Sequence, residues 1–463
     1  MEIFRKKKVN SEKTEMVRNL NSMDLILMGL GSMVGFGIFS VIGLGVATIS
    51  GPALIISIIL AAAAVGVSAI IFAEFSSRIQ MQGGPYGYLY VIFGEFTAWI
   101  VGWLMFSEFL LAIALFSSSW SSYFKGLFHL KLPAVINGAT VVGKGFSVDL
   151  IAILLIAFTT SLVLLNARHV LRFNNALVVL KFSALALFIV VGLFHLNPAN
   201  WHDFAPFGWG KLVGSEKGIF PGVSLIFLSF LGFETLSTAV DEAESPRRNI
   251  PTGILGSLIV SVLFYIMITL VLTGMTDFHG LDVPNALSYG LTKVGENWAA
   301  IYVAIVAVIS MITICISMTY ALSRVLYQIS TDGLLPSALK KLSKKTNVPL
   351  NGTILIGVLG MILGGLFPLE ILSEVLNLST ILYFIVLAIG IIKFRHDYGE
   401  PGPGQVKVPF VPVLPIAFII VGILLLTHYS LFAWLLVVLS LIAAVIVYFA
   451  YGYKHSNLNK KRN

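Results

Sequence analysis

Twelve long apolar segments fill most of the 463-residue chain, and they limit its fold more than any other feature. Each is long enough, or nearly so, to cross the roughly 30 Å hydrocarbon core of a bilayer as a helix. Because 57% of the residues are hydrophobic and only 11% are charged, we expect an all-α integral membrane protein. The predicted spans are residues 22–49, 52–77, 86–124, 148–166, 171–196, 219–239, 252–276, 298–329, 351–367, 370–394, 411–428 and 430–453.

The basic residues divide unevenly between the two sides that twelve spans create. With a cytoplasmic N-terminus, 23 of the 30 Lys and Arg residues fall in cytoplasmic segments and six in outer loops. Loops rich in Lys and Arg face the cytoplasm in multi-span proteins. We therefore expect a cell-membrane protein with cytoplasmic tails at 1–21 and 454–463. Because the basic start is followed by polar residues, we expect no cleaved signal peptide. The single cysteine, Cys315, excludes an intrachain disulfide.

Two of the predicted spans are interrupted by glycine. The first span holds four glycines between residues 29 and 37, and the sixth holds Gly232. Each glycine weakens a helix by about 1 kcal/mol relative to alanine. The interruptions occupy matching places in two five-span halves, 22–196 and 197–394, and residues 395–453 supply two further spans. An odd number of spans inverts one half relative to the other. Interrupted helices in inverted halves indicate a transporter's midplane binding site.

The chemistry of an interrupted helix suits an amino acid. Free N–H groups at the start of a second half-helix attract a carboxylate, and free carbonyls at the end of the first attract an ammonium. An alternative for Gly31 and Gly35 is close helix packing, which small residues four apart also permit. The candidate substrate-binding residues are Gly31, Ser32, Met33, Val34, Gly35, Phe36, Gly37, Glu108, Phe230, Leu231, Gly232 and Phe233.

Lys181 is the charge that an apolar span is least expected to hold. No other charged residue lies between Arg172 and His195. A charge so placed is costly unless it faces protein or water, and burial favours the neutral amine. Lys181 is therefore a candidate proton carrier. The alternative is a lysine that snorkels to the interface or pairs structurally, although about ten apolar or small residues on each side weaken snorkelling.

Other polar residues also lie inside predicted spans. Glu108 is expected to face a cationic substrate or to form a structural pair, and Glu234 to cap the broken sixth helix at its hinge. Ser310 and Thr313 are placed to contact Lys181 or the first-span carbonyls, unless their hydroxyls bond to the preceding helical turn. Glu74 and Arg78, four residues apart, predict a salt bridge at the inner end of the second span.

Several motifs resemble the amino acid–polyamine–organocation superfamily. The stretch 31–39, GSMVGFGIF, looks like its first-helix signature, and 230–234, FLGFE, looks like its sixth-helix signature. The stretch 242–251, EAESPRRNIP, is similar to the conserved segment after the sixth helix. The stretches 323–327 and 332–336 match the end of the eighth helix. Within the superfamily, the chain most resembles bacterial members of the cationic amino acid transporter branch.

The resemblance implies a LeuT-type fold of five plus five inverted helices with two more at the C-terminus. It implies substrate between spans 1, 3, 6, 8 and 10, and an aromatic gate at Phe230. It also implies that Lys181 reaches the first-helix break and replaces a sodium ion. Glu108 matches a glutamate in the third helix of cationic amino acid transporters.

We therefore expect a proton-coupled symporter that imports cationic or small neutral L-amino acids by alternating access. A sodium-independent exchanger of the same fold is the alternative. A membrane enzyme is disfavoured because the sequence has no metal-ligand cluster or catalytic pair, and a channel because it has no repeated pore loop. The expected partners are an L-amino acid, a proton and the lipid bilayer, with no cofactor and no nucleic acid; an accessory subunit is left open.

Overall fold

The computed structural model describes residues 3–8, 20–35, 37–79, 81, 83–128, 130, 132–139, 147–165, 167–212, 215–283, 285–427 and 429–460. Within these ranges the regular structure is helical, and pairing between extended segments is limited to three isolated bridges. The expected all-α class is therefore observed.

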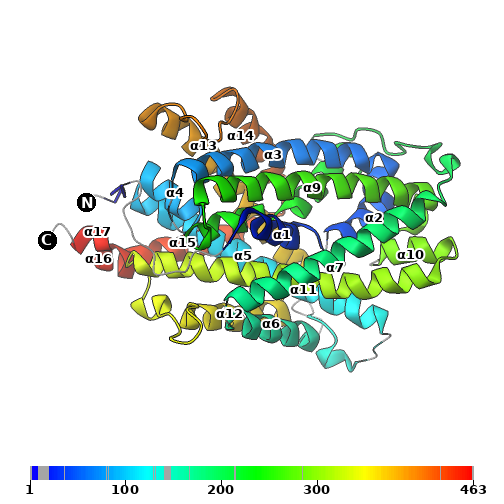
Figure 1. Cartoon of the computed structure of the whole chain (residues 1–463), viewed down its shortest axis with the longest axis horizontal. Helices are drawn as coiled ribbons and strands as arrows, with labels where there is room; N and C mark the ends of the chain where they lie inside the picture. The colour runs from blue at the N-terminus through cyan, green and yellow to red at the C-terminus, as the bar shows by residue number, and fades with distance from the viewer. Residues whose placement is uncertain are drawn as a thin grey trace.

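The helices in chain order carry the labels of Figure 1. They are α1 Ser22–Met33, α2 Ile42–Leu44, α3 Leu54–Arg78, α4 Pro85–Ile92, α5 Glu95–Leu127, α6 Leu150–Val163, α7 Ala167–Leu193, α8 Ile219–Phe227, α9 Pro246–Met275, α10 Ala286–Lys293, α11 Asn297–Thr331, α12 Leu350–Leu366, α13 Leu369–Tyr398, α14 Val413–Leu426, α15 Leu431–Val447, α16 Tyr453–His455 and α17 Asn457–Lys460. Turns of π-helix occupy Gly37–Val41, Gly45–Ser50 and Tyr448–Gly452. Turns of 3₁₀-helix occupy Gly51–Ala53, Ala134–Ile136, Pro198–Trp201, Leu228–Phe230, Phe233–Glu242, Phe278–Gly280 and Ser337–Lys340.

Every predicted span contains helix, and seven helical stretches in the described part are long and apolar enough to cross a membrane. Shorter apolar helices occupy Ser22–Met33, Leu150–Val163, Leu350–Leu366 and Val413–Leu426. The protein is thus a multi-pass membrane protein.

The prediction of one continuous third span over 86–124 is wrong at its start. The structure has α4 and α5 there, separated at Gly94, which has φ +100°. A Cβ on Gly94 would lie 2.5 Å from the backbone carbonyl carbon of Phe4. A side chain would therefore meet the N-terminal segment 3–8, so only glycine allows both this backbone angle and the contact.

The long helices run lengthwise through the molecule, with α1 near its centre (Figure 1). Helix α1 contacts α7, α9 and α11, and α5 contacts α11 and α13. Asn21 caps the start of α1: its side chain accepts hydrogen bonds from the N–H groups of Met23 and Asp24, and its own N–H donates to the Asp24 carboxylate. This capping box satisfies backbone donors that a helix start leaves free.

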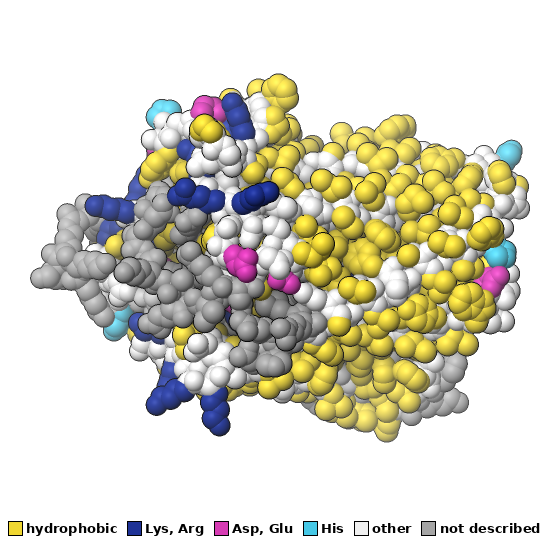
Figure 2. All heavy atoms as spheres, in the orientation of Figure 1, with side chains coloured by type: hydrophobic (Ala, Val, Ile, Leu, Met, Phe, Trp, Pro, Cys, Tyr) yellow, Lys and Arg dark blue, Asp and Glu magenta, His cyan; other side chains and the backbone are white. Residues whose placement is uncertain are grey.

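Both chain ends lie at one end of the molecule (Figure 1). On the face drawn in Figure 2, the Lys and Arg side chains gather at that same end, and hydrophobic side chains cover most of the rest. The predicted ion pair of Glu74 with Arg78 is present, with Oε1 and Nη1 3.1 Å apart. Arg395 of α13 also binds Glu74, at 2.6 Å, so the pair ties α3 to α13.

Candidate functional site

The first predicted interruption is a break in the backbone after α1. The helix ends at Met33 because Val34 is extended, with φ −98° and ψ 109°. Helical structure resumes as the π-helical turn Gly37–Val41. Phe36, one of the predicted binding residues, lies outside the described residues. The break frees carbonyl groups at the end of α1 and N–H groups at the start of the next turn.

The side chain of Lys181, on α7, reaches this break. Its Nζ donates to the carbonyls of Gly31 (3.2 Å) and Val34 and to Thr313 Oγ1 of α11 (2.9 Å). The side chain is fully buried. An ammonium has three N–H donors, and here each has an acceptor. Lys181 therefore links α7, the broken α1 and α11 through one charged group.

Both predicted hydroxyls of α11 bond to the preceding helical turn, Thr313 to the Ser310 carbonyl at 2.6 Å, but only Thr313 also reaches the first break. Thr313 Oγ1 lies 3.0 Å from the Gly31 carbonyl as well as within reach of Lys181. Ser310 donates to the Val306 carbonyl of the preceding turn at 2.6 Å, which was the alternative considered for it. The structure brings Thr313, and not Ser310, to Lys181.

The second interruption separates α8 from the turn Phe233–Glu242. Gly232 has φ +124°, and a Cβ there would lie 2.9 Å from the backbone carbonyl carbon of Ser32. Glycine thus lets the two breaks meet backbone to backbone. The Glu234 carboxylate accepts a hydrogen bond from the Gly232 N–H at 2.9 Å, so it caps the break.

Tyr265 of α9 joins the two breaks, and nothing in the sequence singled it out. Its hydroxyl lies 3.0 Å from the Ser229 carbonyl and 3.4 Å from the Met33 carbonyl. These are the residues where the sixth span and the first span lose their helical bonding. A tyrosine hydroxyl has one hydrogen and can donate fully to only one of these two carbonyls. A shift of either break would therefore change the hydrogen bonding of Tyr265.

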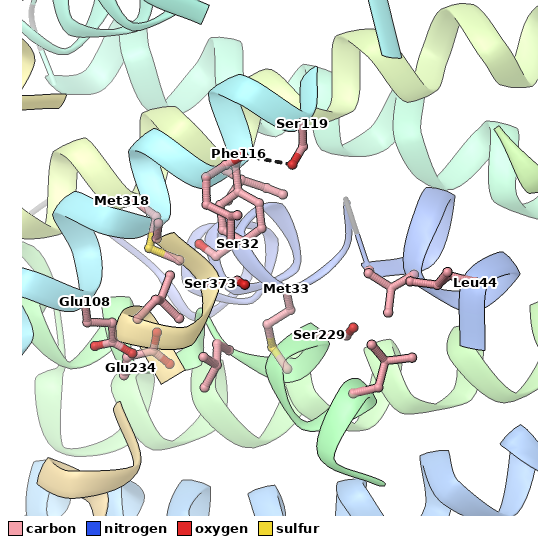
Figure 3. A pocket seen from close by; sticks show the side chains of 18 residues that line it. Ser32, Met33, Leu44, Glu108, Phe116, Ser119, Ser229, Glu234, Met318 and Ser373 are labelled. Carbon is pink, nitrogen blue, oxygen red and sulfur yellow. Dashed lines mark hydrogen bonds between the residues drawn. The ribbon is translucent and has the colours of Figure 1, made fainter. Parts of the chain in front are cut away.

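A cavity of about 260 Å³ lies beside the two breaks (Figure 3). Its wall comes from the segments around both breaks and from α5, α11 and α13. Most of the wall is apolar, with scattered hydroxyls and two carboxyls, as in many small-molecule sites. The lining residues are Ser32, Met33, Gly37, Val41, Leu44, Glu108, Ala112, Leu115, Phe116, Ser119, Leu225, Ser229, Leu231, Glu234, Ile314, Met318, Ser373 and Leu376.

Two carboxyl groups from different elements meet in the cavity wall. Figure 3 shows the Glu108 and Glu234 side chains pointing toward each other at one end of the cavity. Glu108 accepts hydrogen bonds from Thr380 Oγ1 (2.6 Å) and Tyr383 Oη (2.8 Å) of α13. Both glutamates are buried, and none of the ion pairs between described residues includes either of them.

The predicted residues that lie at the breaks and the cavity fall into two groups. Ser32, Met33, Gly37, Glu108, Leu231 and Glu234 line the cavity. Gly31, Val34, Gly35 and Gly232 form the backbone of the breaks behind it.

Phe230 and Phe233 are not among the cavity-lining residues, although the resemblance implies a gate at Phe230. Phe230 packs on Tyr265, with ring centroids 4.9 Å apart, and Phe233 packs on Phe72 and Phe384. Their rings fill the protein interior because each has aromatic neighbours on surrounding helices.

Thr380 and Tyr383 were also missed by the sequence reasoning. Their spacing of three residues places them on one face of α13, so a polar stripe in an apolar span was the available signal. Tyrosine and threonine are common in such spans, and only the contact with Glu108 distinguishes these two.

Comparison with known proteins identifies the family. A family model described as "Amino acid permease" matches residues 20–459. The chain is 37% identical to the methylthioribose transporter of Bacillus subtilis, with 99% of each chain covered. It is 33% identical to the branched-chain amino acid permease BcaP of the same organism, again over 99% of each. It is 30% identical to human cationic amino acid transporter 4, over 84% of this chain and 61% of that one. With the broken helices and the cavity between them, these similarities show that the chain belongs to the amino acid permease family.

Proposed function

We propose that this protein is a proton-coupled symporter that imports L-amino acids across the cell membrane by alternating access. The observation that carries the proposal is the buried Lys181 ammonium bonded to the broken end of α1. The amino acid substrate rests on the family and on relatives such as BcaP, named for branched-chain amino acids.

The bonding of Lys181 suggests how a proton couples to movement. A charged amine donates three hydrogen bonds, whereas a neutral amine has only two N–H groups. Loss of the proton therefore leaves one acceptor at the α1 break without a donor, and a buried acceptor without a donor is costly. The position of α1 then depends on whether Lys181 is protonated.

The substrate's backbone groups have partners at the breaks. The turn that starts at Gly37 provides free N–H groups at a positive dipole end, which favours the substrate carboxylate. Carbonyls near Ser229 and Met33 favour its ammonium. The apolar wall from Leu115, Leu225 and Ile314 suits an aliphatic side chain.

Contacts of Leu20 with Ala243 and Glu242, and of Glu242 with Arg324, lie on one side of the cavity. In the proposal they close the path between the cavity and the cytoplasm. Leu20 forms a bridge with Ala243, and the Leu20 N–H donates to the Glu242 carbonyl at 2.9 Å. Arg324 of α11 binds the Glu242 carboxylate at 2.9 Å. In the proposal, twelve spans form two inverted five-helix halves plus two further helices, both chain ends face the cytoplasm, and these contacts break when the site opens inward.

A sodium-independent exchanger of the same fold is the mechanistic alternative. A second substrate class is a neutral hydroxylated thioether, because the chain resembles a methylthioribose transporter. The cavity offers Met33 and Met318 sulfurs and several serine hydroxyls, which suit a thioether and hydroxyl groups.

Uptake into proteoliposomes tests these possibilities. Radiolabelled amino acids and methylthioribose are each supplied with and without an inward proton gradient. A symporter concentrates an amino acid only with the gradient. An exchanger moves label only when the vesicles are preloaded with amino acid, whatever the gradient. Uptake of methylthioribose alone would replace the proposed substrate class.

A further inference from the structure

Two acids form the polar end of the cavity, and neither has an ion pair among the described residues. Glu108 on α5 and Glu234 at the second break point toward each other (Figure 3), and they interact electrostatically. Both are fully or almost fully buried. In a desolvated site, two interacting carboxylates disfavour full ionisation unless a counter-charge is present. We therefore expect either a proton or a cation to accompany the pair.

Among the described residues, the elements around the pair contribute hydroxyls and apolar groups and form no ion pair with it. α13 supplies the hydroxyls of Thr380 and Tyr383, and Tyr383 is the one other titratable side chain that bonds to either acid in the described part. α11 contributes Met318 to the same wall, and the first break contributes Ser32. Lys181 directs its three bonds to α1 carbonyls and Thr313.

Two polar atoms of cavity-lining residues have no hydrogen-bond partner among the described residues. Glu234 accepts the Gly232 N–H through Oε2, while its Oε1 is buried and has no hydrogen-bond partner in the described part of the chain. Ser229 Oγ, from the other side of the same break, is also buried and unpartnered there. Most buried polar atoms in proteins have a partner, and at a cavity wall these two are placed to bond to a ligand or to water.

We propose that the Glu108–Glu234 pair holds one exchangeable proton, and that a cationic substrate side chain takes the place of that proton. The inference rests on the proposed amino acid transport and specifies its substrate range. A neutral amino acid binds while the pair keeps its proton. A lysine-like substrate inserts its ammonium between the carboxylates, and the proton passes to water.

This exchange fixes the charge in the cavity. The pair with one proton and a neutral side chain carries the same net charge as two carboxylates with one ammonium. Charge-assisted bonds to the ammonium offset its desolvation. The pocket can therefore accept neutral and cationic side chains, whereas an acidic side chain would add a third negative group and be rejected.

Lysine and norleucine test the inference, because they differ chiefly in the terminal ammonium. Binding to the purified full-length protein is measured by titration calorimetry in phosphate and in Tris buffer, which have different ionisation enthalpies and so reveal protons released. We expect lysine to release about one proton more than norleucine. Raising the pH should strengthen lysine binding and weaken norleucine binding, each by at most about tenfold per pH unit.

Variants identify the source of the proton. The double variant Glu108→Gln/Glu234→Gln keeps acceptor oxygens for Tyr383 and Gly232 but cannot titrate, so the lysine–norleucine difference should disappear and lysine affinity should fall. Glu374→Gln is the control, because this α13 residue bonds Ser430 and is not among the cavity-lining residues. It should keep the full difference.

The outcomes separate this inference from the proposed function. Equal proton release by the two ligands in the wild type, failure of lysine to bind where norleucine binds, or a difference retained by the double variant would each overturn the inference and leave amino acid transport standing. Absence of binding by any amino acid would contradict both. If the double variant does not fold, the wild-type comparison alone decides.

Discussion

Lys181 shows how one residue can make a buried charge tolerable. An unpaired ammonium in the protein interior costs several kcal/mol, and charge-assisted hydrogen bonds are the interactions strong enough to offset that cost. Lys181 obtains them from the carbonyls of Gly31 and Val34 and from Thr313. The carbonyls can accept because α1 stops at Met33. The break and the lysine thus require each other.

In the proposal, Lys181 also takes the place of a metal cation among the carbonyls at the α1 break. A fixed ammonium repels Na⁺ at close range. Replacing Na⁺ by choline at constant pH should therefore leave amino acid uptake nearly unchanged. Initial uptake rates in proteoliposomes measure this, and a rate that rises steeply with Na⁺ would show that the cluster serves sodium.

Gly35 gives a second prediction for a single residue. A Cβ at Gly35 would overlap Cδ1 of Ile314, and Ile314 lines the cavity. Gly35→Ala should push Ile314 toward the ligand and raise the Kd by about tenfold, or about 1.4 kcal/mol. Gly66→Ala in α3 is the control, because its Cβ would meet no atom within 4 Å. Ligand-induced thermal stabilisation measures both, and equal affinity in the two variants would refute the packing argument.

Some of these residues were identifiable from the sequence and some were not. Lys181 and Glu108 stood out because a charge in an apolar span needs a partner. Tyr265 and Tyr383 did not stand out, because the chain has 15 tyrosines and their role comes from contacts between distant helices. Periodicity cannot reveal such contacts.

At the scale of elements, the ends of three segments are held together by one buried ion pair. Arg324, only 1% exposed, places its guanidinium 3.6 Å from the Tyr320 ring centre and 2.9 Å from the Glu242 carboxylate. Glu242 ends the turn after the second break, and its carbonyl also binds Leu20. The pair therefore ties α11 to both broken segments.

Removing Arg324 should destabilise the protein strongly. Arg324→Ala leaves the Glu242 carboxylate buried without its counter-charge, at a cost of about 3–5 kcal/mol. Lys407→Ala removes the cation of an exposed pair with Glu400 and should change stability little, because water and salt screen such a pair. Thermal unfolding in detergent compares the two. A similar fall in Tm for both variants would show that the buried pair stabilises the protein no more than the exposed pair does.

Both helix breaks were predicted from the sequence, the first from a cluster of glycines and the second from Gly232, because glycine weakens a helix. It did not separate α4 from α5. Gly94 is a single glycine between Phe93 and Glu95; it has φ +100°, and a side chain there would meet Phe4 of the N-terminal segment. That contact joins residues 90 positions apart, and a local pattern does not contain it. The short α10, in a loop predicted to lie outside, was also not predicted.

At the scale of the whole molecule, the uneven charge predicts an orientation in the membrane. Lys344 lies in a segment predicted to be cytoplasmic, and Ala205 lies in a predicted outer loop; both are exposed. The only native cysteine, Cys315, is buried and can be replaced by serine. In that background, a membrane-impermeant thiol reagent added to intact cells should label Ala205→Cys and spare Lys344→Cys. The opposite pattern would invert the topology.

The most direct test of the central claim measures concentrative uptake by Lys181→Ala. The wild type should accumulate an amino acid when an inward proton gradient is imposed. The variant, which has no titratable group at the α1 break, should bind the substrate but should not accumulate it above the external concentration. Accumulation equal to that of the wild type under the same gradient would contradict the role of Lys181 as the coupling proton carrier.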